Sequence, residues 1–73
     1  MITVKGVGYI NGVSDILGVY NGRFVAIEVK SPGKYLRPDQ KIFRDNIEKH
    51  GGLFILARSI DDVQKSLDGN ALP

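Results

Sequence analysis

The sequence predicts a small α/β domain with a mixed β-sheet, and three observations predict it. Short runs rich in β-branched, aromatic and aliphatic residues alternate with segments of helical periodicity. The dipeptide Asn21-Gly22 separates two of the runs and is typical of a tight type I′ hairpin turn. A strand, a helix and another strand then follow in order, which favours a right-handed parallel crossover. The predicted order is β-β-β-α-β-α, with helices flanking the sheet.

The strands are expected in short apolar runs. Their ranges are 1–5, 15–20, 23–30 and 53–57. Three glycines between residues 6 and 12 predict a loop after the first run. The last run, Leu-Phe-Ile-Leu-Ala, is apolar throughout, which is typical of a strand covered on both faces.

The first helix is expected from Pro38, a favourable first helical residue, to the glycine pair at 51–52. Its core-facing side is expected to carry Ile42, Phe43 and Ile47. His50 is the single histidine of the chain. Its place at the helix end favours a capping role over that of a general base, because cations suit a helix C-terminus.

The second helix is expected to begin after Ser59, whose side chain can cap its N-terminus, and to stop at Gly69. Ile60, Val63 and Leu67 recur at helical spacing, so we expect all three to face the core.

Length and composition bound the function. Seventy-three residues allow one domain, 1–73, with a limited core, and oligomerisation is one source of further buried area. Cysteine is absent, so neither disulfides nor thiolate metal sites are available. No apolar run approaches the roughly 20 residues of a membrane span, and the first five residues do not resemble a signal peptide. We expect an intracellular protein that does not associate with membranes.

Basic residues concentrate between residues 30 and 49, although the net charge of the chain is only +2. Such a patch can hold a phosphate backbone. The candidate nucleic-acid contacts are Lys34, Arg37, Lys41 and Arg44. The alternative interpretation of these charges is an ordinary solvated helix face. Tyr9 and Tyr35, in loops expected to flank the active site, are candidates either for stacking on bases or for packing contacts.

Two carboxylates and a lysine are expected to meet at the end of the hairpin. Glu28 and Lys30 are two residues apart in a strand, so they point to the same face. Asp15 opens the preceding strand, across the hairpin. Burying such charges is costly unless they pair or meet a metal ion. The alternative is an edge strand with a solvent-exposed ion pair, next to an Asp in a common turn.

This set of residues suits metal-dependent phosphodiester hydrolysis. Asp15 and Glu28 can bind Mg²⁺ or Mn²⁺, which takes oxygen ligands and retains water, and the carbonyl of Val29 is the natural third ligand. Lys30 can orient the attacking water and stabilise the developing negative charge. The candidate catalytic residues are therefore Asp15, Glu28 and Lys30.

The same motifs resemble the VRR-NUC domain, a compact branch of the PD-(D/E)xK nuclease superfamily, in the minimal form of phage and other viral genomes. Gly12-Val13-Ser14-Asp15 is similar to its Gly-x-Pro/Ser-Asp, and Glu28-Val29-Lys30 to its Glu-x-Lys. Residues 33–40 resemble its turn into a helix that bears Gln, which makes Gln40 a candidate active-site residue. Residues 51–63 resemble its C-terminal part.

The resemblance implies a metal-dependent, structure-selective DNA endonuclease with a PD-(D/E)xK nuclease-like core. It further implies a homodimer that acts on branched DNA such as Holliday junctions, in the host cytoplasm if the chain is phage-encoded. Two features depart from the family pattern. No acidic residue precedes Asp15, so the core is expected to be shortened at the N-terminus, with weaker metal binding or slower cleavage. Ser14 replaces the more common Pro.

Two other functions remain open from the sequence. One is a catalytically weak or inactive DNA-binding relative, which would bind branched DNA without cleaving it. The other is a small non-enzymatic α/β interaction domain, which would show neither DNA affinity nor a response to metal ions.

Overall fold

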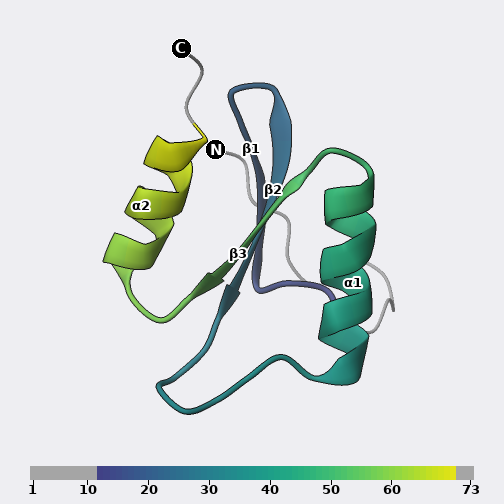
Figure 1. The fold of residues 1–73 in the computed structure, drawn as a ribbon, viewed down its shortest axis with the longest axis vertical. Coiled ribbons are helices and arrows are strands. Elements are labelled where there is room, and N and C mark those ends of the chain that lie inside the picture. The colour runs from purple at the N-terminus through teal and green to yellow at the C-terminus, as the bar shows by residue number, and fades with distance from the viewer. Residues whose placement is uncertain (1–11, 71–73) are drawn as a thin grey trace.

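The computed structural model describes residues 12–70 of the chain. Three strands and two helices follow one another in this part (Figure 1). They are β1 (Ile16–Tyr20), β2 (Arg23–Val29), α1 (Pro38–Lys49), β3 (Leu53–Ala57) and α2 (Ile60–Gly69). The α/β class and the order of these elements are confirmed. The strand predicted over 1–5, most of the loop over 6–12 and Tyr9 lie outside the described residues.

The sheet of the described residues has the order β1-β2-β3 and is mixed. β1 and β2 are antiparallel, and the turn between them has positive φ at both Asn21 (51°) and Gly22 (78°), as a type I′ hairpin requires. β2 and β3 are parallel and are joined through α1, as the crossover rule predicts. The predicted strand ends shift slightly, since Asp15 precedes β1 and Lys30 follows β2.

The two helices lie on opposite sides of the sheet (Figure 1). The buried core, Val25, Ile27, Ile55 and Ala57, lies on the side of α2, whose Val63 and Leu67 pack against it. On the other side α1 contacts β2 and β3. β3 is therefore covered on both faces, as its continuous apolar run predicts.

Two apolar residues do not face the core, contrary to prediction. Ile42 is 64% exposed, because it is about 200° around the helix from Gln40, which is buried. Ile60 is 88% exposed, because as the first residue of α2 it lies at the end of the sheet, where it lines a pocket with Val29 and Ala57. The remaining predicted positions, Phe43, Ile47, Val63 and Leu67, are partly buried.

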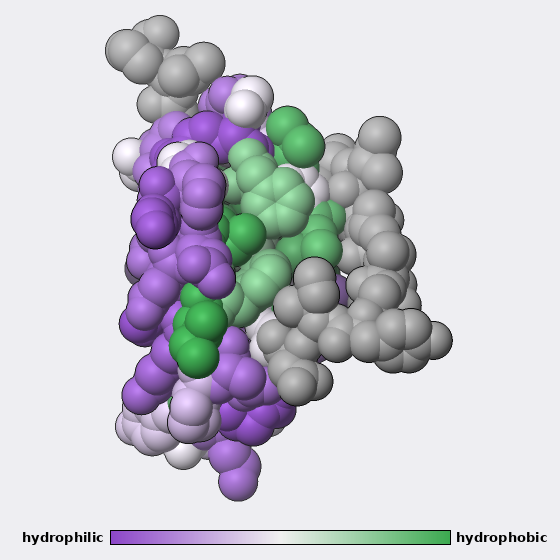
Figure 2. Space-filling model, turned by 90° about the vertical axis from the view of Figure 1, so that its right-hand side faces the viewer, coloured by the Kyte–Doolittle hydropathy of each residue, from purple (hydrophilic) through white to green (hydrophobic). Residues whose placement is uncertain are grey.

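The α1 side of the molecule carries an apolar area beside a hydrophilic band (Figure 2). The cross-strand partners Val19 and Phe24 are exposed by 57% and 42%. Val19 lies on β1, whereas α1 packs mainly over β2 and β3.

Both helices begin and end as their sequences predict, with one difference. Ser59 caps α2 by accepting a hydrogen bond from the Asp62 N–H (3.2 Å). The imidazole Nδ1 of His50 lies 2.9 Å from the carbonyl oxygen of Asn46, at the C-terminal end of α1. Gly69 is the last residue of α2 rather than its stop, and Asn70 is the C-cap. No helix within residues 12–70 has the length and apolar character needed to cross a membrane.

Candidate active site

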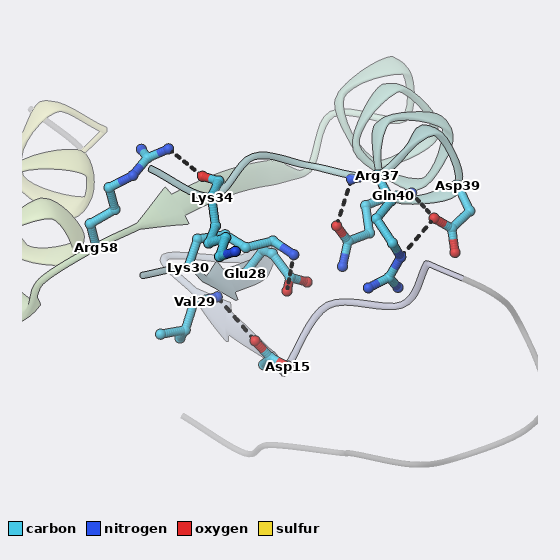
Figure 3. A network of polar contacts seen from close by, with 9 residues as sticks. All are labelled: Asp15, Glu28, Val29, Lys30, Lys34, Arg37, Asp39, Gln40 and Arg58. Atoms are coloured by element: carbon cyan, nitrogen blue, oxygen red, sulfur yellow. Dashed lines mark hydrogen bonds and ion pairs between the residues drawn. The ribbon is translucent and has the colours of Figure 1, made fainter. Parts of the chain in front are cut away.

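The candidate site lies where β2 ends, beside the start of β1 and the end of β3. Ile16 pairs with Ile27, so the register continued by one residue places Asp15 opposite Glu28. The backbone N–H of Val29 donates a hydrogen bond to Oδ2 of Asp15 (3.1 Å; Figure 3). The hairpin therefore brings together the two carboxylates that are thirteen residues apart in the sequence.

Glu28 is a buried acid in the middle strand of the sheet. It is 4% exposed, and its Oε1 has no hydrogen-bond partner among the described residues. Lys30 lies on the same face, with its Nζ 3.7 Å from Oε2 of Glu28. Burial raises the pKa of Glu28, and the negative charge of Asp15 raises it further, whereas the charges of Lys30 and Arg37 oppose this rise. The positive charges of Lys30 and Arg37 therefore compensate the charged form of Glu28 only in part.

The alternative of a solvent-exposed ion pair on an edge strand is wrong. β2 is flanked by β1 and β3, and the side chains of Lys30 and Glu28 are only 14% and 5% exposed. A buried pair of this kind gives little net stability.

The donors present fit a hard divalent cation. Asp15 and Glu28 provide carboxylate oxygens, and the buried Oε1 of Glu28, which no described residue satisfies, is an atom that such an ion would satisfy. The backbone N–H of Val29 points toward Asp15. In a strand, the N–H and C=O of one residue point toward the same neighbouring strand, so the carbonyl of Val29 is also directed toward the Asp15 side. Within residues 12–70 no cluster of three or more His, Cys, Asp or Glu side chains could hold a metal. Val29 and water would have to complete the ligand set.

Gln40 is buried in the first turn of α1, with 4% exposure. Its Oε1 accepts a hydrogen bond from the Arg37 backbone N–H (2.9 Å), which caps the helix. Figure 3 shows its side chain extending from α1 on the side where Glu28 lies. The amide oxygen is therefore occupied, and the amide NH₂ is the group left to act in the site.

Compared with known protein families, residues 6–61 match the VRR-NUC domain. This chain belongs to the VRR-NUC family. The match assigns it a nuclease-type function on DNA, and it spans Asp15, Glu28, Lys30 and Gln40. No curated protein and no solved structure matches the chain.

The basic residues of this VRR-NUC domain divide into two groups. Arg37 and Arg44 are paired with acids of α1, Asp39 (3.3 Å) and Asp45 (2.9 Å), respectively. Lys34 and Lys41 are exposed, and neither forms an ion pair with a described residue. Of the predicted nucleic-acid contacts, these two lysines are the more available for a phosphate.

Arg58 belongs to the same region of the VRR-NUC domain, and sequence reasoning missed it. Its Nη2 donates a hydrogen bond to the carbonyl oxygen of Lys34 (2.7 Å), and its guanidinium lies over the Tyr35 ring, 5.5 Å from the centroid. Arg58 is the first residue after β3. This position could have identified Arg58 from the sequence, because ligands of α/β sheets bind near the carboxyl ends of parallel strands.

Gly12, three residues before Asp15, packs against the first turn of α1. Its φ is +81°, and a Cβ at this position would overlap the backbone of Asp39 and Gln40. The close approach requires glycine, and it places the start of β1 beside the first turn of α1. The family-like Gly-x-Ser-Asp motif therefore has a physical reason for its first residue.

Replacing Gly12 by Ala should destabilise the domain by about 2–5 kcal/mol, because left-handed strain adds to overpacking. Denaturant unfolding measures this loss. Gly22→Ala is the matched control, since Gly22 has a similar φ of +78° but no atom within 4 Å of an added Cβ. The control should lose only about 1–2 kcal/mol. Equal losses in the two variants would contradict the close packing at Gly12.

Proposed function

We propose that this VRR-NUC domain is a Mg²⁺- or Mn²⁺-dependent endonuclease that hydrolyses phosphodiester bonds of DNA. The observation that carries the proposal is the pair of adjacent carboxylates, Asp15 and Glu28, with a buried oxygen of Glu28 that has no hydrogen-bond partner within residues 12–70. A fold gains nothing from such an oxygen unless a ligand satisfies it.

Each residue of the site has a role in the proposal. Asp15, Glu28 and the carbonyl of Val29 would hold the cation. A bound Mg²⁺ or Mn²⁺ supplies charge relief for the phosphate and activation of the attacking water. Lys30 places its ammonium beside the carboxylates, where it can orient the water and stabilise negative charge that develops on the phosphate. Gln40 donates from its amide NH₂ to the phosphate or to the water.

The DNA backbone is proposed to run over the loop and helix that follow β2. Lys34 and Lys41 are exposed there, and Arg37 and Arg44 can contribute by exchanging their neighbouring acids for phosphates. We further propose that the substrate is branched DNA, such as a Holliday junction, and that a homodimer cleaves it. This proposal is supported by the resemblance to minimal viral VRR-NUC domains and by the fact that two sites related by a twofold axis suit symmetric strand cleavage.

Metal binding should stabilise the domain, and more strongly as the pH rises. The pKa of Glu28 is higher in the folded chain than the ordinary value of 4.5, which applies to the unfolded chain. Without metal, the contribution of Glu28 to the free energy of unfolding therefore falls as the pH rises from 4.5 through the pKa of the folded chain. A cation binds the ionised form and reverses that trend. At free metal tenfold above the Kd, the gain is about 1.4 kcal/mol. Thermal unfolding in Mg²⁺ or Mn²⁺ against EDTA, from pH 5 to pH 8, measures the shift, which is roughly 6–11 °C.

Two variants make this measurement specific. Asp15→Asn should lose the metal-dependent shift, since it removes one ligand charge. Asp61→Asn removes an exposed carboxylate that pairs with Lys65 on α2, and it should keep the shift. A shift of the same size in Asp15→Asn, or none in the unmodified chain, would contradict the proposed ligand set.

A further inference from the structure

Tyr35 is an exposed aromatic side chain in the loop that leads from the end of β2, where the candidate site lies, to α1. It is 74% exposed. Arg58 places its guanidinium 5.5 Å from the ring centroid. A cation over one side of the ring fixes the ring plane, and the exposure leaves much of the ring open to a ligand.

The backbone around Tyr35 is fixed at several points. Lys34 N–H donates to the Ser31 carbonyl (3.1 Å), and Arg58 donates to the Lys34 carbonyl (2.7 Å). Lys30 N–H donates to the Ala57 carbonyl (3.0 Å), which joins the start of the loop to the end of β3. The ring is therefore presented in a defined position at low entropic cost, as a binding surface needs.

Charge in this region favours a nucleic acid over another partner. Val29 pairs with Ala57, so the parallel register continued by one residue places Arg58 beside Lys30, on the same face as Glu28. Among the described residues no carboxylate lies within ion-pair distance of the Arg58 guanidinium. An open aromatic ring flanked by available cations is the arrangement that binds single-stranded nucleic acid.

We infer that Tyr35, braced by Arg58, is a stacking platform for an unpaired base next to the phosphodiester in the candidate site. This inference rests on the proposed function for the identity of the ligand as DNA. A duplex keeps its bases stacked internally, whereas a bulge or a flap offers an unpaired base to the ring. Tyr35 then favours DNA with unpaired bases.

The test compares two DNA duplexes of the same sequence, one with a single bulged 2-aminopurine and one fully paired. Binding is measured in EDTA and again in Ca²⁺, through 2-aminopurine fluorescence and through affinity. The unmodified chain should quench the bulged base. Tyr35→Ala should lose most of the quenching and bind the bulged DNA about tenfold more weakly, with affinity for the paired duplex within twofold.

Two controls separate stacking from bracing of the loop. Tyr35→Phe keeps the ring and should keep the quenching. Ile42→Ala removes another large exposed side chain, 64% exposed on α1, and should behave as the unmodified chain. Quenching that survives in Tyr35→Ala, equal weakening on both DNAs, or no binding of either DNA by the unmodified chain would overturn the inference.

Cleavage in Mg²⁺ and Mn²⁺ is measured on the same DNAs, so the two proposals fail separately. Tyr35-dependent quenching without cleavage would support stacking and overturn the nuclease mechanism. Cleavage of both DNAs that does not depend on Tyr35 would support the mechanism and overturn stacking.

Discussion

Replacing Glu28 by Gln is expected to abolish metal-dependent cleavage while leaving the metal-free domain as stable as the unmodified chain, or more stable, at pH 7. The fold raises the pKa of Glu28 mainly through burial, so it disfavours the charged carboxylate relative to a neutral group of the same shape. Loss of a metal ligand removes several kcal/mol of transition-state stabilisation, or about 10³-fold in rate. Thermal unfolding in EDTA and cleavage in Mg²⁺ measure the two effects.

Glu48→Gln is the matched control, because Glu48 is an exposed acid on α1. It should leave the rate of cleavage unchanged. A large loss of stability in Glu28→Gln would mean that the Glu28–Lys30 pair is a structural ion pair. Cleavage at the unmodified rate would remove Glu28 from the mechanism.

Replacing Lys30 by Ala should lower the cleavage rate by about 10²–10³-fold, with the metal-dependent rise in thermal stability retained. The Lys30 ammonium lies 3.7 Å from Glu28, and it is the one cation among the described residues within ion-pair distance of that carboxylate. Its proposed contribution is made to the phosphate rather than to metal binding. Its removal also takes away a charge that lowers the pKa of Glu28, so metal binding should require a higher pH. Single-turnover cleavage and thermal unfolding across pH measure both effects.

Lys65→Ala provides the comparison, since Lys65 lies on α2 and pairs only with Asp61 among the described residues. Its cleavage rate should not change. If Lys30→Ala instead loses the metal-dependent stabilisation at every pH and its rate falls only for that reason, Lys30 is a positioning residue for Glu28.

Local signals in the sequence predicted the part of the site that depends on one hairpin. Asn21-Gly22 determines the turn, and the turn determines the register that places Asp15 opposite Glu28. The two-residue period of a strand then places Lys30 beside Glu28. No longer-range information was needed for these three residues.

Contacts between distant segments were harder to predict. Whether Glu28 and Lys30 were buried or exposed depended on β3 pairing beside β2, which strand propensity does not determine. Arg58 reaches Lys34 across 24 positions of the sequence, and its role depends on the parallel register. Gly12 was predicted as part of a loop and as the first residue of the family-like motif, but its contact with Asp39 and Gln40 was not predicted, because that contact requires α1 to be in place.

Errors in the predicted core also have a physical origin. Ile42 was grouped with Phe43 and Ile47 as an apolar residue of the same helix, although the buried side of α1 is defined by Gln40 and the residues in line with it. An amphipathic helix buries apolar residues, so the apolar pattern did not predict that Gln40 would lie on the buried side of α1. It is placed there by its helix-capping contact with Arg37 and by its proximity to the site.

The most direct test of a metal-dependent nuclease centred on Asp15 and Glu28 is cleavage of a labelled four-way junction and of a linear duplex. Each DNA is incubated in Mg²⁺, in Mn²⁺ and in EDTA, with the Asp15→Asn variant in parallel. The expected result is cleavage of the junction that requires the metal and is absent in the variant. Binding of the junction with no cleavage under any metal condition, or cleavage that persists in Asp15→Asn, would contradict the proposed mechanism.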